Sequence, residues 1–183
     1  MHFFWLYLAV VSSTFASQEH KQLKKVQQLF PDNAYGVDVS KYQGKVNWPQ
    51  LREQIDFVFV KATEGVNTTD TYFLYNWQQA KRHGITRGAY HFFHGHISGS
   101  AQAQHLINTV GKYHEEDLPL VVDVESARTT RFVSPKEYTK QLQAFIDHVK
   151  RKTGDEPIIY TNYYFWQSFL KKVHMFFQAM IFG

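Results

Sequence analysis

The sequence predicts an α/β protein built on a parallel sheet with helices outside it. Two observations carry this prediction. Short strand-like runs alternate five times with segments of helical periodicity, and the runs are apolar throughout, as strands covered on both faces are. The length of 183 residues suits one domain. A barrel and a doubly wound sheet both satisfy the pattern, but no glycine-rich phosphate loop follows the first strand, which disfavours a nucleotide-binding sheet.

The first three strand-helix units are delimited by local signals. Asn47 is expected to cap a short helix with Pro49 in its first turn, and a helix over 70–83 ends at Gly84, a residue type favoured just after helix C-termini. A third helix, from about 100 to 112, repeats apolar residues at helical spacing. The strands that precede these helices are expected at 35–40, 56–62 and 88–93.

The last two units contain the clearest helix signature in the chain. Ser134 is expected as N-cap, with Pro135 in the first turn, Glu137 at N3 and an apolar stripe after them. A fifth strand is expected over 157–161, followed by a helix over 163–172.

Two carboxylates mark the fourth strand, 118–126. Asp123 and Glu125 stand two residues apart in an otherwise apolar run, so they point the same way if the strand continues, with about 6 to 7 Å between their backbone positions. Buried strands seldom carry charge, and two neighbouring acids are the usual means of hydrolysing a glycosidic bond. An ion-paired sheet interior is the structural alternative.

Composition narrows the class of protein further. With 44% hydrophobic and 20% charged residues the chain is globular, and because cysteine is absent neither disulfides nor thiolate zinc sites can form. The net charge of +4 favours anionic polymers such as bacterial wall, whereas the dispersed Lys and Arg residues disfavour nucleic acid. The aromatic content of 17% suits either a filled core or a sugar-stacking cleft.

The N-terminal segment is typical of an exported protein. Residues 1–16 form a short apolar run that ends in small residues, which predicts a signal peptide cleaved after Ala16, and residues 17–34 are a polar linker. No other stretch is long and apolar enough to cross a bilayer. We therefore expect a secreted monomer without stable membrane association after cleavage.

Several motifs in order resemble the glycoside hydrolase family 25 lysozymes. The resemblance runs from about Tyr35 to Leu170. Its motifs are YGVDVSKYQG at 35–44, FVFVKATEG at 57–65, GAYHF at 88–92 and LVVDVE at 120–125. The resemblance implies an irregular TIM-like (β/α) barrel over 35–170, with five βα units followed by three further strands. It also implies cleavage of the β-1,4 bond between N-acetylmuramic acid and N-acetylglucosamine in peptidoglycan, without a metal or other cofactor.

The resemblance also assigns roles to three acids. Glu125 matches the general acid, whose pKa would be raised by the neighbouring Asp123 and by a low-dielectric setting. Asp123 matches the residue that orients the substrate's own acetamido group as nucleophile. Spacing alone leaves a direct carboxylate nucleophile open. Asp38 matches a further active-site acid and is interpreted as a substrate contact; the alternative is a cap of the following turn.

Other candidate substrate contacts are less specific. Glu64 either lines the cleft or forms a structural salt bridge. Aromatic side chains near the strand ends can stack on sugar rings or fill the core; they are Tyr90, Phe92, Tyr160 and Trp166. His91, His94 and His96 suggest a metal site, but no matching acid or histidine cluster lies on the earlier strands, so we expect none.

The resemblance is expected to end before the chain does. Residues 171–183 read as a divergent apolar tail, and the last three strands of the family have no counterpart, which predicts weak hydrolysis or none. The first alternative is a wall-binding protein without catalysis. A chitinase-like enzyme is the second, although the usual aspartate two residues before Asp123 is replaced by Val121.

Overall fold

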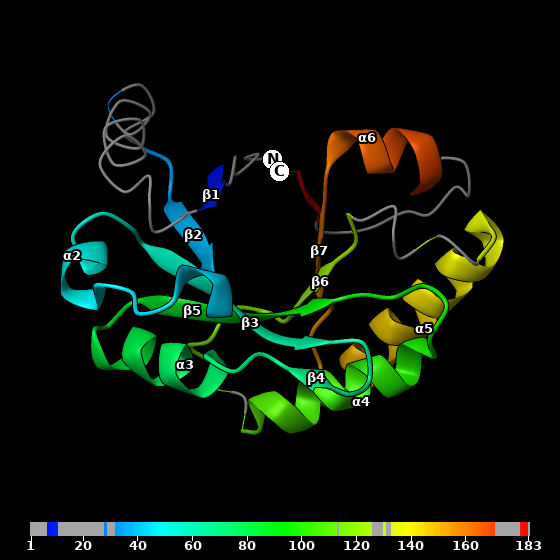
Figure 1. Ribbon diagram of the computed structural model, residues 1–183, viewed down its shortest axis with the longest axis horizontal. Helices are drawn as coiled ribbons and strands as arrows, with labels where there is room; N and C mark the ends of the chain where they lie inside the picture. The colour runs from blue at the N-terminus through cyan, green and yellow to red at the C-terminus, as the bar shows by residue number, and fades with distance from the viewer. Residues whose placement is uncertain are drawn as a thin grey trace. The chain divides into compact units, whose positions relative to one another are not determined.

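The computed structural model describes residues 7–10, 28, 32–112, 114–125, 130, 133–170 and 180–182. For residues 7–10, 168 and 180–182 it describes the backbone but not the side chains. The fold is α/β with a parallel sheet, as predicted (Figure 1). Two compact units can be distinguished. Unit 1 comprises Met1–Lys61 and Asp70–Gly88, and unit 2 comprises Ala62–Thr69 and Ala89–Gly183. Strands β3 (Phe57–Glu64) and β5 (Thr86–Phe92) contribute to both.

Unit 1 contains the first strands and two helices. Strand β1 (Tyr7–Val10) pairs in parallel with β2 (Tyr35–Val39), which pairs in parallel with β3. A 3₁₀ turn (Lys41–Gln43), α2 (Trp48–Arg52) and α3 (Phe73–Arg82) complete it. The predicted cap of α2 is confirmed, because Asn47 accepts a hydrogen bond from the Gln50 N–H. Strand β1 lies inside the segment predicted as a signal peptide, whose cleavage stays a prediction.

The core of unit 1 is apolar and aromatic. Trp48 and the central β3 residues Val58 and Val60 are fully buried. The Trp77 ring stacks with a neighbouring aromatic ring of α3 at 5.5 Å between centroids, and the Arg87 guanidinium lies over Trp77 at 3.8 Å. The charge of Arg87 is tolerated in this core because its Nη1 also donates to the Trp77 carbonyl at 2.7 Å.

Unit 2 contains the remaining parallel strands. Strand β6 (Val121–Asp123) pairs with β5 on one side and with β7 (Ile158–Thr161) on the other, and β7 pairs with β8 (Met180–Phe182). The short β4 (Thr68–Thr69) returns antiparallel along the end of β3. The predicted tail without a strand is thus incorrect for its last residues, since Met180–Phe182 extend the sheet. Residues 171–179 lie outside the described residues.

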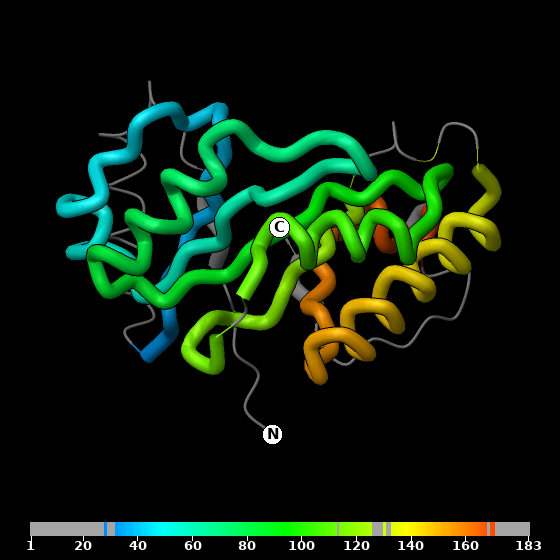
Figure 2. The backbone as a smooth tube through the Cα atoms, turned by 90° about the horizontal axis from the view of Figure 1, so that it is seen from below, coloured from blue at the N-terminus to red at the C-terminus, as the bar shows by residue number. Residues whose placement is uncertain are grey.

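Helices α4 (Gly99–Val110) and α5 (Pro135–Thr153) run side by side in unit 2 (Figures 1 and 2). The predicted start of α5 is confirmed, because the Ser134 side chain accepts from the Glu137 N–H. The helix ends at Gly154, whose φ of 89° only glycine adopts without strain. The short α6 (Tyr163–Phe165) and a π-helical turn (Trp166–Leu170) follow β7.

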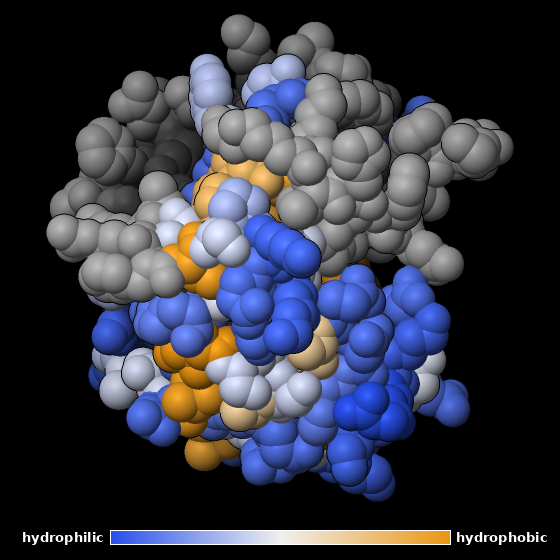
Figure 3. Space-filling view, turned by 90° about the vertical axis from the view of Figure 1, so that its right-hand side faces the viewer, coloured by the Kyte–Doolittle hydropathy of each residue, from blue (hydrophilic) through white to orange (hydrophobic). Residues whose placement is uncertain are grey.

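An aromatic cluster packs the residue that follows β5, Phe93, against α5. The rings of Phe93, Tyr138 and Phe145 are fully buried and pack edge to face, which shows that many of the aromatic residues serve the core. The described surface seen in Figure 3 is mostly hydrophilic, with a narrower hydrophobic band. Within the described part of the chain, every helix is too short or too polar to traverse a bilayer.

Candidate active site

Two acids lie where strand β6 ends. Asp123 is the last residue of β6 and is 8% exposed, and Glu125 lies two residues further on and is half-buried. Burial raises the pKa of Glu125 above that of an ordinary glutamic acid, because removal from water disfavours the charged form. The predicted strand extended to residue 126, so the structure corrects it: one acid belongs to the sheet and the other to the segment after it.

One face of the unit 2 sheet gathers four predicted site residues. Phe92, Asp123 and Tyr160 are register partners on β5, β6 and β7. Tyr90 shares their face because it precedes Phe92 by two residues. His91 points to the opposite face, where its ring lies 5.2 Å from an aromatic ring of α5. Tyr90, Phe92 and Tyr160 are half-buried on the face away from that helix.

The segment after β6 stays attached to β7 although it is no longer a strand. The Val124 N–H donates to the Tyr160 carbonyl at 2.9 Å, and the Thr161 hydroxyl donates to the Val124 carbonyl at 2.8 Å. The Asn162 amide then donates to the Glu125 carbonyl at 3.1 Å. The main chain of Glu125 is therefore tied to the end of β7.

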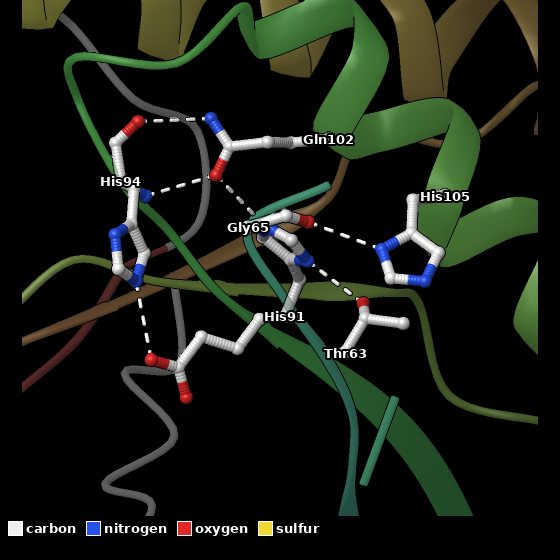
Figure 4. Close-up of polar contacts among 7 residues, drawn as sticks. Thr63, Gly65, His91, His94, Gln102 and His105 are labelled. Atoms are coloured by element: carbon white, nitrogen blue, oxygen red, sulfur yellow. Dashed lines mark hydrogen bonds and ion pairs between the residues drawn. The ribbon is translucent and has the colours of Figure 1, made fainter. Parts of the chain in front are cut away.

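A buried polar network lies on the helix side of the sheet (Figure 4). The fully buried His91 contacts the Thr63 hydroxyl through Nδ1 at 2.7 Å and the Gln102 carbonyl oxygen through Nε2 at 3.1 Å. Because that oxygen only accepts, His91 Nε2 carries a proton, and its Nδ1 accepts from Thr63 in the neutral ring. The three side chains join β3, β5 and α4.

Gln102 also fixes the loop that follows β5. Its side-chain oxygen accepts from the His94 N–H at 2.9 Å, and its amide donates to the carbonyls of His94 at 2.9 Å and Ile97 at 3.1 Å (Figure 4). These contacts settle the orientation of the amide, since both carbonyls require a donor. One buried side chain thus determines the path of the loop that carries His94.

Glu64 and His94 meet at the ends of β3 and β5. Their side chains lie 3.2 Å apart, and both are partly exposed. This contact agrees with the salt-bridge interpretation of Glu64, while a role in substrate binding stays a prediction. The His96 ring lies 5.6 Å from that of His94. Within the described residues, histidines and acids form no group of three or more that could hold a metal ion.

Replacing Thr63 with valine tests the network. We expect the free energy of unfolding to fall by about 1–2 kcal/mol, because His91 Nδ1 loses its partner in a buried setting while the side-chain shape is kept. Chemical denaturation measures the change. Thr63→Ser retains the hydroxyl and should keep most of the parent's free energy of unfolding. Equal stability of Thr63→Val and the parent would show that the network does not stabilise the protein.

Asp38 and Trp166 are the predicted residues with the least structural support. Asp38 is half-buried near the end of β2 in unit 1, and Trp166 is half-buried after α6. The alternative interpretation of Asp38 as a cap is not supported, because the side chain that caps the following turn is Ser40, which accepts from the Tyr42 N–H. The roles of Asp38 and Trp166 in substrate binding stay predictions.

Sequence reasoning missed three residues that shape the site. Gln102 could have been found, since it lies four residues before Leu106 and eight before Val110, on the buried stripe of α4. A polar residue on such a stripe needs internal partners. Thr161 and Asn162 carried a weaker signal, namely polar residues between an apolar strand and a helix that needs a cap.

An acid pair at the carboxyl end of a parallel strand is an arrangement found in glycosidases. The sequence profile of Glycosyl hydrolases family 25 matches residues 37–180, and the chain belongs to this family. The match extends past Leu170, where the resemblance was predicted to end.

Relatives and a solved structure agree with this assignment. YegX of Escherichia coli K12 is 37% identical over 140 residues, covering 73% of this chain and 50% of YegX. Lysozyme M1 of Streptomyces globisporus is 34% identical over 140 residues, covering 73% of this chain and 48% of that protein. A family 25 glycosyl hydrolase from Bacillus anthracis superposes with a TM-score of 0.72 at 34% identity, covering 80% of this chain and 67% of that one. The chain spans about half the length of these curated relatives.

Proposed function

We propose that the protein is a muramidase, which hydrolyses the β-1,4 bond between N-acetylmuramic acid and N-acetylglucosamine in peptidoglycan. The observation that carries the proposal is the acid pair at the end of β6, in which burial raises the pKa of Glu125. Membership of family 25 supports it, and so does the name of a relative, Lysozyme M1.

Glu125 is proposed as the general acid. A raised pKa keeps a larger fraction of its carboxyl protonated at the pH of the reaction, so it can donate a proton to the glycosidic oxygen as the bond from that oxygen to C1 breaks. The same residue, now ionised, then accepts a proton from the water that attacks C1. Glu125 is therefore protonated again after one turnover, with no net gain or loss of protons.

Asp123 is proposed to orient the acetamido group of the substrate. As the glycosidic bond breaks, the acetamido oxygen bonds to C1, and the Asp123 carboxylate stabilises the positive charge that develops on the acetamido nitrogen. The attacking water then displaces the acetamido oxygen from C1, which restores the acetamido group. The position of Asp123 between Phe92 and Tyr160 in the sheet supports such a role, because the register fixes its backbone on both sides. A direct attack by Asp123 on C1 is the alternative mechanism.

The sugar rings are proposed to lie along the aromatic face of the unit 2 sheet. Tyr90, Phe92 and Tyr160 share this face and are half-buried rather than fully buried, which suits stacking on a pyranose. We further infer that Glu64, Asp38 and Trp166 contact the substrate, that the sheet adopts the family's irregular (β/α) barrel architecture, and that the chain is exported and acts as a monomer.

The choice of substrate tests the proposal. Purified peptidoglycan should release soluble muropeptides in the presence of the protein, whereas chitin oligomers of matched length should stay intact. Release from chitin alone would favour a chitinase-like enzyme. Pull-down on peptidoglycan without any release, unchanged by Glu125→Gln, would instead identify a wall-binding protein.

The pH dependence of hydrolysis follows from the state of Glu125. The general acid works only when protonated, so kcat/KM should fall on the basic side, with a midpoint above the pKa of an ordinary glutamic acid. Initial rates of muropeptide release across a pH series, in buffers of constant ionic strength, measure the midpoint. A basic limb at or below the unperturbed value would contradict the assignment of Glu125.

A further inference from the structure

We propose that Thr161 and Asn162 are positioning residues that form a clamp on the main chain of Val124 and Glu125. The inference rests on the proposed function only for the consequence in catalysis; the clamp itself is a structural claim. Its members come directly from the end of β7, and their partners lie 37 residues earlier in the sequence. No part of the clamp depends on the side-chain carboxyl that performs the chemistry.

The need for a clamp comes from where β6 stops. Regular pairing with β7 ends at Asp123, yet Glu125 is two residues further on. Beyond the ladder a main chain is held only by individual contacts, and small displacements of a reacting group are costly in catalysis. Side chains of Thr161 and Asn162 replace the missing ladder, since each donates to one carbonyl of this segment.

Asn162 has two roles that can be separated by substitution. Its side-chain oxygen accepts from the Phe165 N–H at 2.8 Å and caps α6, while its amide nitrogen donates to the Glu125 carbonyl at 3.1 Å. Serine is as good an N-cap as asparagine but lacks the reach and the amide donor. Asn162→Ser should therefore keep the cap and remove the contact with Glu125.

Thr161 allows a matched test of the other half of the clamp. The residue is fully buried, and its hydroxyl donates to the Val124 carbonyl at 2.8 Å. Thr161→Val removes the hydroxyl and keeps the branched shape, whereas Thr161→Ser keeps the hydroxyl. The clamp predicts that the valine variant behaves like Asn162→Ser and that the serine variant behaves like the parent.

The experiment has two readouts on the full chain. NMR titration of the ¹³C-labelled Glu125 carboxyl should show its pKa falling in Asn162→Ser toward the ordinary value, because the released segment exposes the carboxyl to water. Peptidoglycan hydrolysis should show kcat reduced about 10- to 100-fold with KM within about twofold. The control is Asn47→Ser, which alters the asparagine cap of α2 in unit 1 and should change neither readout.

The titration of the Glu125 carboxyl tests the clamp independently of the rate of peptidoglycan hydrolysis. A Glu125 titration in Asn162→Ser and Thr161→Val identical to that of the parent would overturn the clamp. A shifted titration in a protein whose parent form does not hydrolyse peptidoglycan would support the clamp and refute the proposed function.

Discussion

Glu125→Gln is expected to lower kcat for peptidoglycan about 10²- to 10⁴-fold, the range that general acid–base catalysis typically contributes. Glutamine keeps the shape of the side chain but has no acidic proton to give to the leaving oxygen. Substrate contacts are retained, so KM should change little. Initial rates of muropeptide release at saturating peptidoglycan measure the effect, and Glu115→Gln, a change at an exposed glutamate, is the matched control.

The same substitution should leave the fold at least as stable at neutral pH. The folded-state pKa of Glu125 is raised, so the stability associated with its protonated form is fully present below the unfolded-state pKa. That stability is lost as the pH rises through the folded-state pKa. Glutamine stays neutral throughout and removes this loss. An inactive Glu125→Gln variant that is also unfolded, or one that retains the parent's rate, would contradict the assignment.

Gly99→Ala is expected to destabilise the protein by about 3 kcal/mol, at the upper end of the usual cost of overpacking. A Cβ at Gly99 would lie 1.8 Å from the carbonyl oxygen of Gln141 and 2.9 Å from the backbone nitrogen of Phe145. These are main-chain atoms of α5, so no rotamer change relieves the clash. The Gly99 N–H also donates to the Gln141 side chain at 2.9 Å, and separation of the helices would lengthen that contact.

Thermal unfolding followed by circular dichroism measures this effect. For a chain of this size, the expected loss corresponds to a fall in Tm of about 6–12 °C. Ser100→Ala, at the next position of α4, serves as control and should shift Tm by no more than about 2 °C. A Gly99→Ala protein that melts with the parent would show that α4 and α5 do not approach each other as closely as the structure has them.

Local signals in the sequence were sufficient for the start of α5, whereas the helix predicted over 163–172 is a short α6 followed by a π-helical turn. Ser134, Pro135 and Glu137 predicted the start of α5, and the structure has the Ser134 cap in place, because capping depends only on residues within one turn. The parallel α/β class was likewise predictable from the alternation of strand and helix patterns. The acid pair was recognisable because charge in a buried strand is rare.

Features that depend on distant partners were not predictable in the same way. The end of β6 and the support of Glu125 depend on Thr161 and Asn162, which no local pattern links to that strand. The pairing of β8 depends on a free edge of β7, and three residues are too short a run to show strand alternation. The hydrogen bonds of His91 were not predictable either, because its partners come from β3 and α4.

Glu125 is proposed to catalyse cleavage on the muramic acid side of the glycan linkage. The most direct test of this claim is borohydride reduction of the products of peptidoglycan digestion, followed by identification of the reduced sugar. Cleavage by the parent protein should yield muramitol ends, and Glu125→Gln should yield almost none in the same time. Glucosaminitol ends, or equal amounts of muramitol from both proteins, would contradict the claim.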